Sequence, residues 1–168
     1  MSDNRKDNSY RIRAGVINSA LEVEDALTLV LGGFYNPTAS FHDLFINRLV
    51  ADVLSDLTFD KKIKLFTGFV NEFDSSLRGV SQILNKIREI RNQLAHRTYY
   101  DSREMELLFE LVEPKSEDDK FIFEKIGKPG FTFTLDDLRE YQEMCHDVTN
   151  QIYIVANEII KYLNSDKK

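Results

Sequence analysis

Residues 134–163, TLDDLREYQEMCHDVTNQIYIVANEIIKYL, decide the fold. Apolar side chains recur in this stretch at alternating spacings of three and four residues, which is the period of one face of an α-helix. Thr134 and Asp137 resemble the capping box that begins many helices, with Asp in place of the usual Glu. We therefore expect one long C-terminal helix over 135–163 that packs along other helices. Its predicted buried seam consists of Leu138, Tyr141, Cys145, Val148, Ile152, Val155, Ile159 and Tyr162.

The region 8–97 carries the patterns of four more helices. The first is expected to end at the stretch GGFYNP, 32–37, because a Gly pair followed by Asn-Pro disfavours continuation of a helix. Thr58 or Asp60 is expected to cap the third helix. The predicted core faces are Ile12, Val16, Ala20, Val23, Leu27 and Val30 in the first helix, Phe41, Phe45, Leu49 and Val53 in the second, Ile63, Phe66, Val70 and Phe73 in the third, and Val80, Ile83, Ile87, Ile90 and Leu94 in the fourth.

Between the fourth helix and the last one, residues 104–134 change to the alternating pattern of strands. Three short segments show it: MELLFELVEP at 105–114, KFIFEKIG at 120–127 and FTFT at 131–134. A hairpin or small meander of this size cannot build a core alone, so it should pack on the helices. The expected fold is a single mainly α domain over 1–168, an up-and-down bundle of about five helices with a small antiparallel hairpin or meander before the last helix.

Composition and charge argue against several classes of protein. The chain has 168 residues, a net charge of −6 and a pI of about 5.1, so it lacks the overall basic character of tight non-specific nucleic-acid binders. The lysines of KKIK, 61–64, are interpreted as a solvated helix face. No apolar run approaches a membrane span and the N-terminus does not resemble a secretory signal, so a cytoplasmic location is expected. The three histidines lie far apart and no glycine-rich phosphate loop is present, so neither a metal nor a cofactor is expected.

Polar residues gather at the end of the fourth predicted helix, which runs from near Ser76 to about His96. Arg88, Asn92 and His96 are spaced four residues apart and form one ridge, whereas Arg91 lies about 140° around the axis from His96. Two interpretations are open. The group is either a catalytic cluster or the polar C-terminal end of a core helix, where cationic side chains interact favourably with the helix dipole.

The segment IRNQLAH, 90–96, resembles the signature of the HEPN superfamily, in which Arg, a polar residue and then His lie near the end of a late helix. Arg91, Asn92 and His96 match this motif, with four residues between Arg and His. The order of four helices, a short hairpin and a long final helix also resembles HEPN proteins, including the mannitol-repressor-like group. The resemblance implies an all-helical homodimer joined through the motif helix.

The resemblance further implies a metal-independent endoribonuclease. His96 would be the general base or acid, since an ordinary imidazole exchanges protons near neutral pH. Arg91 would hold the scissile phosphate and stabilise its developing charge. Asn92 would orient His96 or bond the phosphate, and the products would be a 2′,3′-cyclic phosphate and a 5′-hydroxyl.

Further residues of the expected site come from outside the motif. Arg88 is expected beside it, contacting substrate or supporting the catalytic groups. Glu22 and Asp25 of the first helix either face the motif helix and pair with Arg88 or Arg91, or form a solvated acidic stripe.

One position departs from the toxin branch of the superfamily. That branch usually has Tyr two residues after the His, where this chain has Thr98. The net charge of −6, the missing basic face and the long heptad-like final helix favour an alternative, a non-catalytic HEPN module that regulates or binds another protein, as in the mannitol-repressor-like group. The two hypotheses predict different partners: RNA for the ribonuclease, and a regulatory protein or antitoxin for the module. A third alternative is nucleotide binding without cleavage, since the same Arg and His pocket could hold a phosphate.

Overall fold

A computed structural model describes residues 2–35, 52–73, 78–99, 120–125 and 128–165, and the observations below concern these residues. As the sequence predicts, the fold is mainly helical, with a small antiparallel sheet before the last helix. The elements are α1 (Ser2–Tyr35), α3 (Phe59–Phe73), α4 (Arg78–Ala95), β1 (Thr98–Tyr99), β2 (Lys120–Lys125), β3 (Lys128–Thr134) and α6 (Leu135–Ser165).

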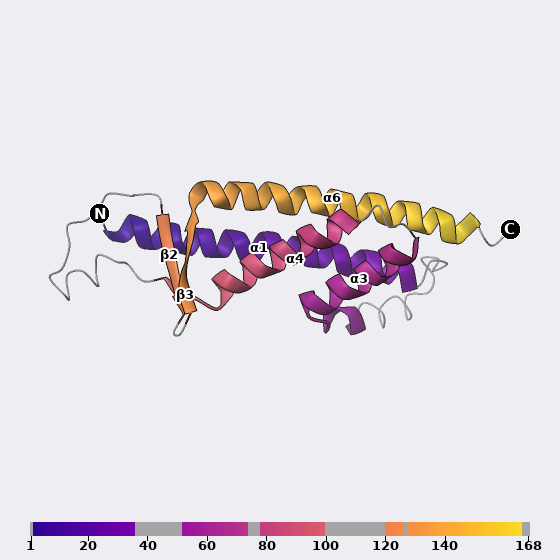
Figure 1. The fold of residues 1–168 in the computed structure, drawn as a ribbon, viewed down its shortest axis with the longest axis horizontal. Coiled ribbons are helices and arrows are strands. Elements are labelled where there is room, and N and C mark those ends of the chain that lie inside the picture. Colours follow the sequence, from indigo (N-terminus) through magenta and orange to yellow (C-terminus); the bar gives the residue numbers. More distant parts are fainter. Residues whose placement is uncertain (1, 36–51, 74–77, 100–119, 126–127, 166–168) are drawn as a thin grey trace.

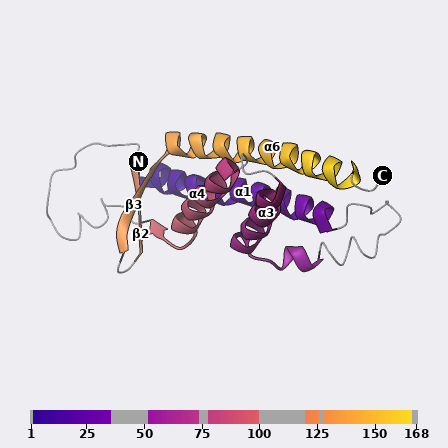
Figure 2. The same ribbon diagram turned by 45° about the vertical axis from the view of Figure 1, so that its right-hand side comes forward.

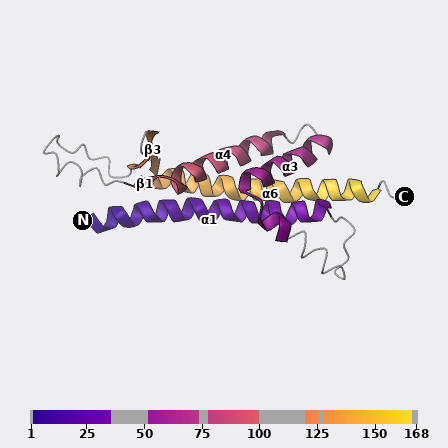
Figure 3. The ribbon, with the colours of Figure 1, turned by 90° about the horizontal axis from the view of Figure 1, so that it is seen from below.

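Helices α1 and α6 are the long elements of the molecule. They lie side by side and run in the same direction, so both C-terminal ends point to the same side (Figure 1, Figure 3). Gly15 marks their close approach, because a Cβ atom at this position would lie 2.9 Å from Cδ1 of Leu138. A side chain at Gly15 would therefore push the two helices apart or displace Leu138.

Helices α3 and α4 form an antiparallel pair on one face of the α1–α6 pair (Figure 2). Their pairing is fixed by a hydrogen bond of 3.0 Å between the hydroxyls of Thr67 and Ser81. Thr58 caps α3, since its hydroxyl accepts a hydrogen bond of 3.4 Å from the main-chain N–H of Lys61. One hydrophobic core runs through all four helices and includes Phe121, Phe123 and Phe133 of the sheet.

The predicted seam of α6 is buried from Leu138 to Ile159. The predicted capping box is also confirmed, because Asp137 accepts hydrogen bonds from the N–H and hydroxyl of Thr134 and the Thr134 hydroxyl accepts one from the Asp137 N–H. Tyr162 is the exception, with 54% of its surface exposed. Helix α6 extends past the end of α1 (Figure 1).

The first helix ends within the predicted stretch GGFYNP, 32–37, although not at its first glycine. Helix α1 continues through Gly32 and Gly33 to Tyr35. Phe34 explains the extension, because it is buried and packs against two rings of α3, with centroid distances of 6.4 Å to Phe66 and 5.0 Å to Phe69. This aromatic packing outweighs the poor helix propensity of the two glycines.

The sheet has the strand order β1-β2-β3, with both pairs antiparallel. Strands β2 and β3 correspond to the predicted segments 120–127 and 131–134. Strand β1 was not predicted, and its two residues pair with β2 in the register Thr98 to Glu124 and Tyr99 to Phe123. The predicted strand at 105–114, and the predicted second helix apart from its helical residues 52–54, lie outside the described residues.

The KKIK segment is only partly a solvated face. Lys61 and Lys64 are exposed, but the side chain of Lys62 is 4% exposed and forms an ion pair of 2.9 Å with Glu24 of α1. This buried pair joins α3 to α1. None of the described helices combines the length and the apolar character needed to cross a bilayer.

Candidate functional site

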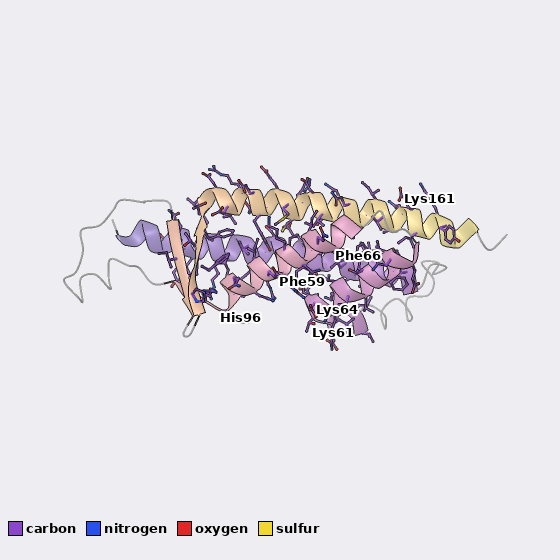
Figure 4. All side chains as sticks on the ribbon, viewed as in Figure 1. Phe59, Lys61, Lys64, Phe66, His96 and Lys161 are labelled. Atoms are coloured by element: carbon purple, nitrogen blue, oxygen red, sulfur yellow. The ribbon has the colours of Figure 1, made fainter. Side chains whose placement is uncertain are left out.

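The ridge predicted on the fourth helix lies at the exposed end of α4. Asn92 is on its last two turns and is exposed, and His96 follows the last helical residue and is also exposed. His96 lies beside the small sheet (Figure 4). Among the described residues, the imidazole of His96 forms no hydrogen bond or ion pair. It is therefore accessible to a ligand or to a second chain.

Arg91 is half-buried, closer to the core face than the ridge is. Its Nη1 donates a hydrogen bond of 3.1 Å to Oδ1 of Asn92. Asn92 therefore connects Arg91 to the ridge that carries His96. Arg91 and His96 form no direct contact with each other, as expected for two side chains about 140° apart on a helix.

Tyr141 of α6 lies beneath this part of α4, and Cys145 is buried one turn further along α6. The Tyr141 hydroxyl donates a hydrogen bond of 3.2 Å to the main-chain oxygen of Ile87. Burial raises the pKa of Tyr141, and the nearby charge of Arg91 acts in the opposite direction. Burial also raises the pKa of Cys145 to about 12, so this thiol is neutral and serves as packing.

Arg88, the first member of the ridge, is held by helix α3. Its guanidinium forms an ion pair and a hydrogen bond with Asp60, and Asp60 also pairs with Lys64 at 2.7 Å. The hydrogen bond from Lys64 and the charges of Lys64 and Arg88 lower the pKa of Asp60. The partner of Arg88 is therefore a residue of α3 and not one of α1.

Glu22 and Asp25 are both exposed on α1. Neither forms an ion pair or a hydrogen bond with Arg88 or Arg91. Both carboxylates are thus exposed on α1, without a direct bond to either arginine. Glu22 lies close enough to Cys145 for its charge to contribute to the raised pKa of the thiol.

Two arginines that the sequence analysis did not single out anchor the end of α4. Arg13 of α1 donates hydrogen bonds from Nε to the main-chain oxygen of Leu94, at 2.9 Å, and from Nη2 to those of Ala95, at 3.1 Å, and Arg97. The carbonyls of Leu94 and Ala95 belong to the last turn of the helix, where no intrahelical donor is available, and that of Arg97 follows the helix. Arg13 therefore caps α4 at the turn that precedes His96.

Arg97 joins the same end of α4 to the sheet. It is 5% exposed, and its guanidinium donates to Oε1 of Gln93 and to the main-chain oxygens of Phe123 and Pro129. It also lies over the ring of Phe131, 5.8 Å from the centroid. Because Arg97 follows His96 directly, the position of His96 is fixed on both sides. The only sequence signal for this role was an arginine directly after a predicted helix.

Within the described ranges, no group of three or more His, Cys, Asp or Glu side chains is arranged to hold a metal ion. The site consists of Arg91, Asn92 and His96, with Arg88 beside them. Its groups can bind an anion through a guanidinium and can exchange a proton through an imidazole. Comparison of the chain with protein-family models, with curated proteins and with solved structures found no match.

Proposed function

We propose that the protein is a metal-independent endoribonuclease of the HEPN type that acts as a homodimer. The observation that supports this proposal is the combination of an exposed His96 side chain with an anchored main chain around it. His96 is exposed and without a protein partner among the described residues, yet the residues on both sides of it are anchored, Ala95 by Arg13 and Arg97 by both Arg13 and the sheet. A general acid or base depends on a fixed position, and the anchored main chain supplies one for His96.

The reaction needs no metal in this proposal. His96 takes the proton of a ribose 2′-hydroxyl, and the 2′-oxygen attacks the adjacent phosphorus. The bond between phosphorus and the 5′-oxygen then breaks, and the leaving oxygen receives a proton from a second acid. Arg91 holds the non-bridging oxygens, on which negative charge develops. The products are a 2′,3′-cyclic phosphate and a 5′-hydroxyl.

In this proposal a homodimer supplies a second histidine and brings it close to Arg91. Within one chain Arg91 and His96 point in different directions around α4, and there is only one histidine at the site. Two α4 helices that meet across a two-fold axis would place His96 near Arg91 of the partner subunit. The partner subunit's His96 would then be the second acid. The exposed end of α4, at Asn92 and His96, is the surface through which this contact would form.

A second function is supported by the outer surface of α6. Asp136, Glu140, Glu143 and Asp147 are all exposed, and their spacing of four, three and four residues places them on one stripe. An acidic stripe of this kind suits a basic protein partner better than it suits RNA. The alternative is therefore a regulatory or protein-interaction module in which the motif serves folding or dimerisation.

The deciding experiment incubates the purified protein with labelled RNA in the presence of EDTA and analyses the ends of any products. Wild type should cleave and leave a cyclic phosphate, and His96→Ala and Arg91→Ala should not. The matched control is His146→Ala, because His146 is also an exposed histidine but lies on α6 next to Asn150. The proposal is wrong if His96→Ala cleaves as fast as wild type, or if folded, dimeric wild type leaves a range of RNAs intact.

A further inference from the structure

Exposed basic side chains collect where the beginning of α3 meets α4. Lys61 and Lys64 are exposed on the first turns of α3, with 74% of the Lys64 side chain accessible. Arg88 of α4 reaches the same place through Asp60, which pairs with both Lys64 and Arg88. In Figure 4, Lys61, Lys64 and His96 lie along one edge of the molecule, whereas Lys161 lies on the opposite edge, on α6.

This group of cations is continuous with the candidate site. Arg88 begins the ridge that Asn92 and His96 continue, and the eight residues from Arg88 to His96 correspond to about 12 Å along the helix axis. An extended nucleic-acid strand that reaches His96 can therefore place a neighbouring phosphate at Arg88 and Lys64. For a chain with a net charge of −6, such a local site is how an anionic substrate would be held.

Asp60 limits the attraction of this surface for anions. Its carboxylate neutralises Lys64 and Arg88, and these two cations lower its pKa. Glu89 adds a weaker contribution, with a carboxylate oxygen 3.8 Å from the Arg88 guanidinium. A phosphate that binds here must compete with Asp60 for the same two cations.

We propose that Lys61, Lys64 and Arg88 form a binding surface for the RNA backbone that leads to His96, and that Asp60 restrains its affinity. This inference rests on the proposed ribonuclease function, because it names the surface that holds the substrate of that site. It adds Lys61, Lys64 and Asp60 to the residues that the motif indicates. Recognition is through phosphates, so this surface contributes affinity and salt dependence without base specificity.

The test measures binding separately from cleavage. All proteins carry His96→Ala, and the dissociation constant for a fluorescein-labelled single-stranded oligouridylate is measured by anisotropy at several salt concentrations. Lys64→Gln and Arg88→Gln should each weaken binding about two- to fivefold, the range of an exposed ion pair. Each should also lower the salt slope by about 0.7, the value for one single-strand phosphate contact. Lys161→Gln is the matched control and should change neither quantity.

The Asp60→Asn variant gives the most informative result. General damage to the protein would weaken RNA binding, whereas this substitution is expected to strengthen it. It should tighten binding about two- to fivefold, since both cations are released for phosphate. This gain should be smaller when Arg88→Gln is added, because only Lys64 is then released. Circular dichroism confirms that each variant is folded.

Failure of this inference can be told apart from failure of the proposed function. If wild type cleaves RNA but Lys64→Gln and Arg88→Gln bind as the control does, the surface proposed here is wrong and the ribonuclease proposal stands. If binding depends on these residues but no RNA is cleaved, the surface stands and catalysis is wrong. If the protein binds no RNA, both are wrong. Unchanged or weaker binding by Asp60→Asn would show that Asp60 has only a structural role.

Discussion

The Nε atom of Arg13, on the first helix, donates a hydrogen bond of 2.9 Å to the main-chain oxygen of Leu94, in the last turn of α4. The same guanidinium reaches two further carbonyls of this segment. A side chain of α1 thus closes the helix that carries the candidate site, and the stability of that site depends on a residue far away in the sequence.

Replacement of Arg13 tests this cap. Arg13→Met should lower the free energy of unfolding by about 1.5–3 kcal/mol, the range for hydrogen bonds to a charged group, because several carbonyls lose their donor. Urea denaturation followed by circular dichroism measures the change. Arg11→Met is the control, since Arg11 is an exposed arginine on the same helix. Equal stability of the two variants would show that the cap contributes nothing.

The buried ion pair between Lys62 and Glu24 gives a second prediction. Lys62→Met should destabilise the protein by about 3–5 kcal/mol, because it leaves the Glu24 carboxylate without its cation in a largely buried place. Lys61→Met, one residue earlier but exposed, should change stability by less than about 0.5 kcal/mol. Adding Glu24→Gln to Lys62→Met should restore part of the loss. Thermal and urea unfolding of the four proteins measure these differences.

Arg97 should control the attachment of the small sheet. Arg97→Lys keeps the charge but lacks the planar group that reaches Gln93 and two main-chain oxygens and lies over Phe131. We expect faster amide hydrogen exchange in β2 and β3, with little change in the middle of α6. Exchange followed by mass spectrometry reads both regions in one experiment. Equal protection of the sheet in wild type and variant would contradict this role.

Alkaline pH should destabilise the protein through Cys145. The folded state raises the pKa of this thiol from 9.0 to about 12, so folding favours the protonated form. The contribution of the Cys145 thiol to the free energy of unfolding is complete below about pH 9. It is lost as the pH rises from about 9 towards 12, because the thiol of the unfolded chain releases its proton first. The raised pKa of Tyr141 acts in the same direction at higher pH. Cys145→Ser should flatten the dependence between pH 9 and 10, as measured by urea unfolding.

The same burial makes the thiol unreactive. A disulfide reagent that forms a coloured product should modify Cys145 slowly in the native protein at pH 8 and rapidly in denaturant. Fast modification without denaturant would show that the packing around this part of α6 opens readily. This measurement needs no variant, because Cys145 is the single cysteine of the chain.

Local pattern was sufficient for much of the fold. The seam from Leu138 to Ile159 and the cap at Thr134 depend on residues within one helix, so spacing alone predicted them. Leu84 was missed, although it is fully buried. Helix α4 contacts α1, α3 and α6, so its buried face is wider than the single stripe that periodicity detects.

The surroundings of the candidate site were less predictable. The ridge followed from the helical period, but the partners of its residues did not. Arg88 pairs with Asp60 of α3, and the end of α4 is anchored by Arg13 of α1 and by Arg97 against the sheet. These contacts join residues that are distant in sequence. A long side chain such as Arg can reach many possible hydrogen-bond partners, so the partner that it uses is known only from the packed structure.

The parallel arrangement of α1 and α6 has a consequence for folding during synthesis on the ribosome. Gly15 and Leu138 come from opposite ends of the sequence, so the apolar face of α1 is synthesised long before α6 exists to cover it. At about 5–20 residues per second, this face waits for several seconds or longer. The pair α3 and α4, which emerges in between, can shield part of it. A nascent chain stalled before α6 should therefore recruit chaperones that recognise exposed apolar surface.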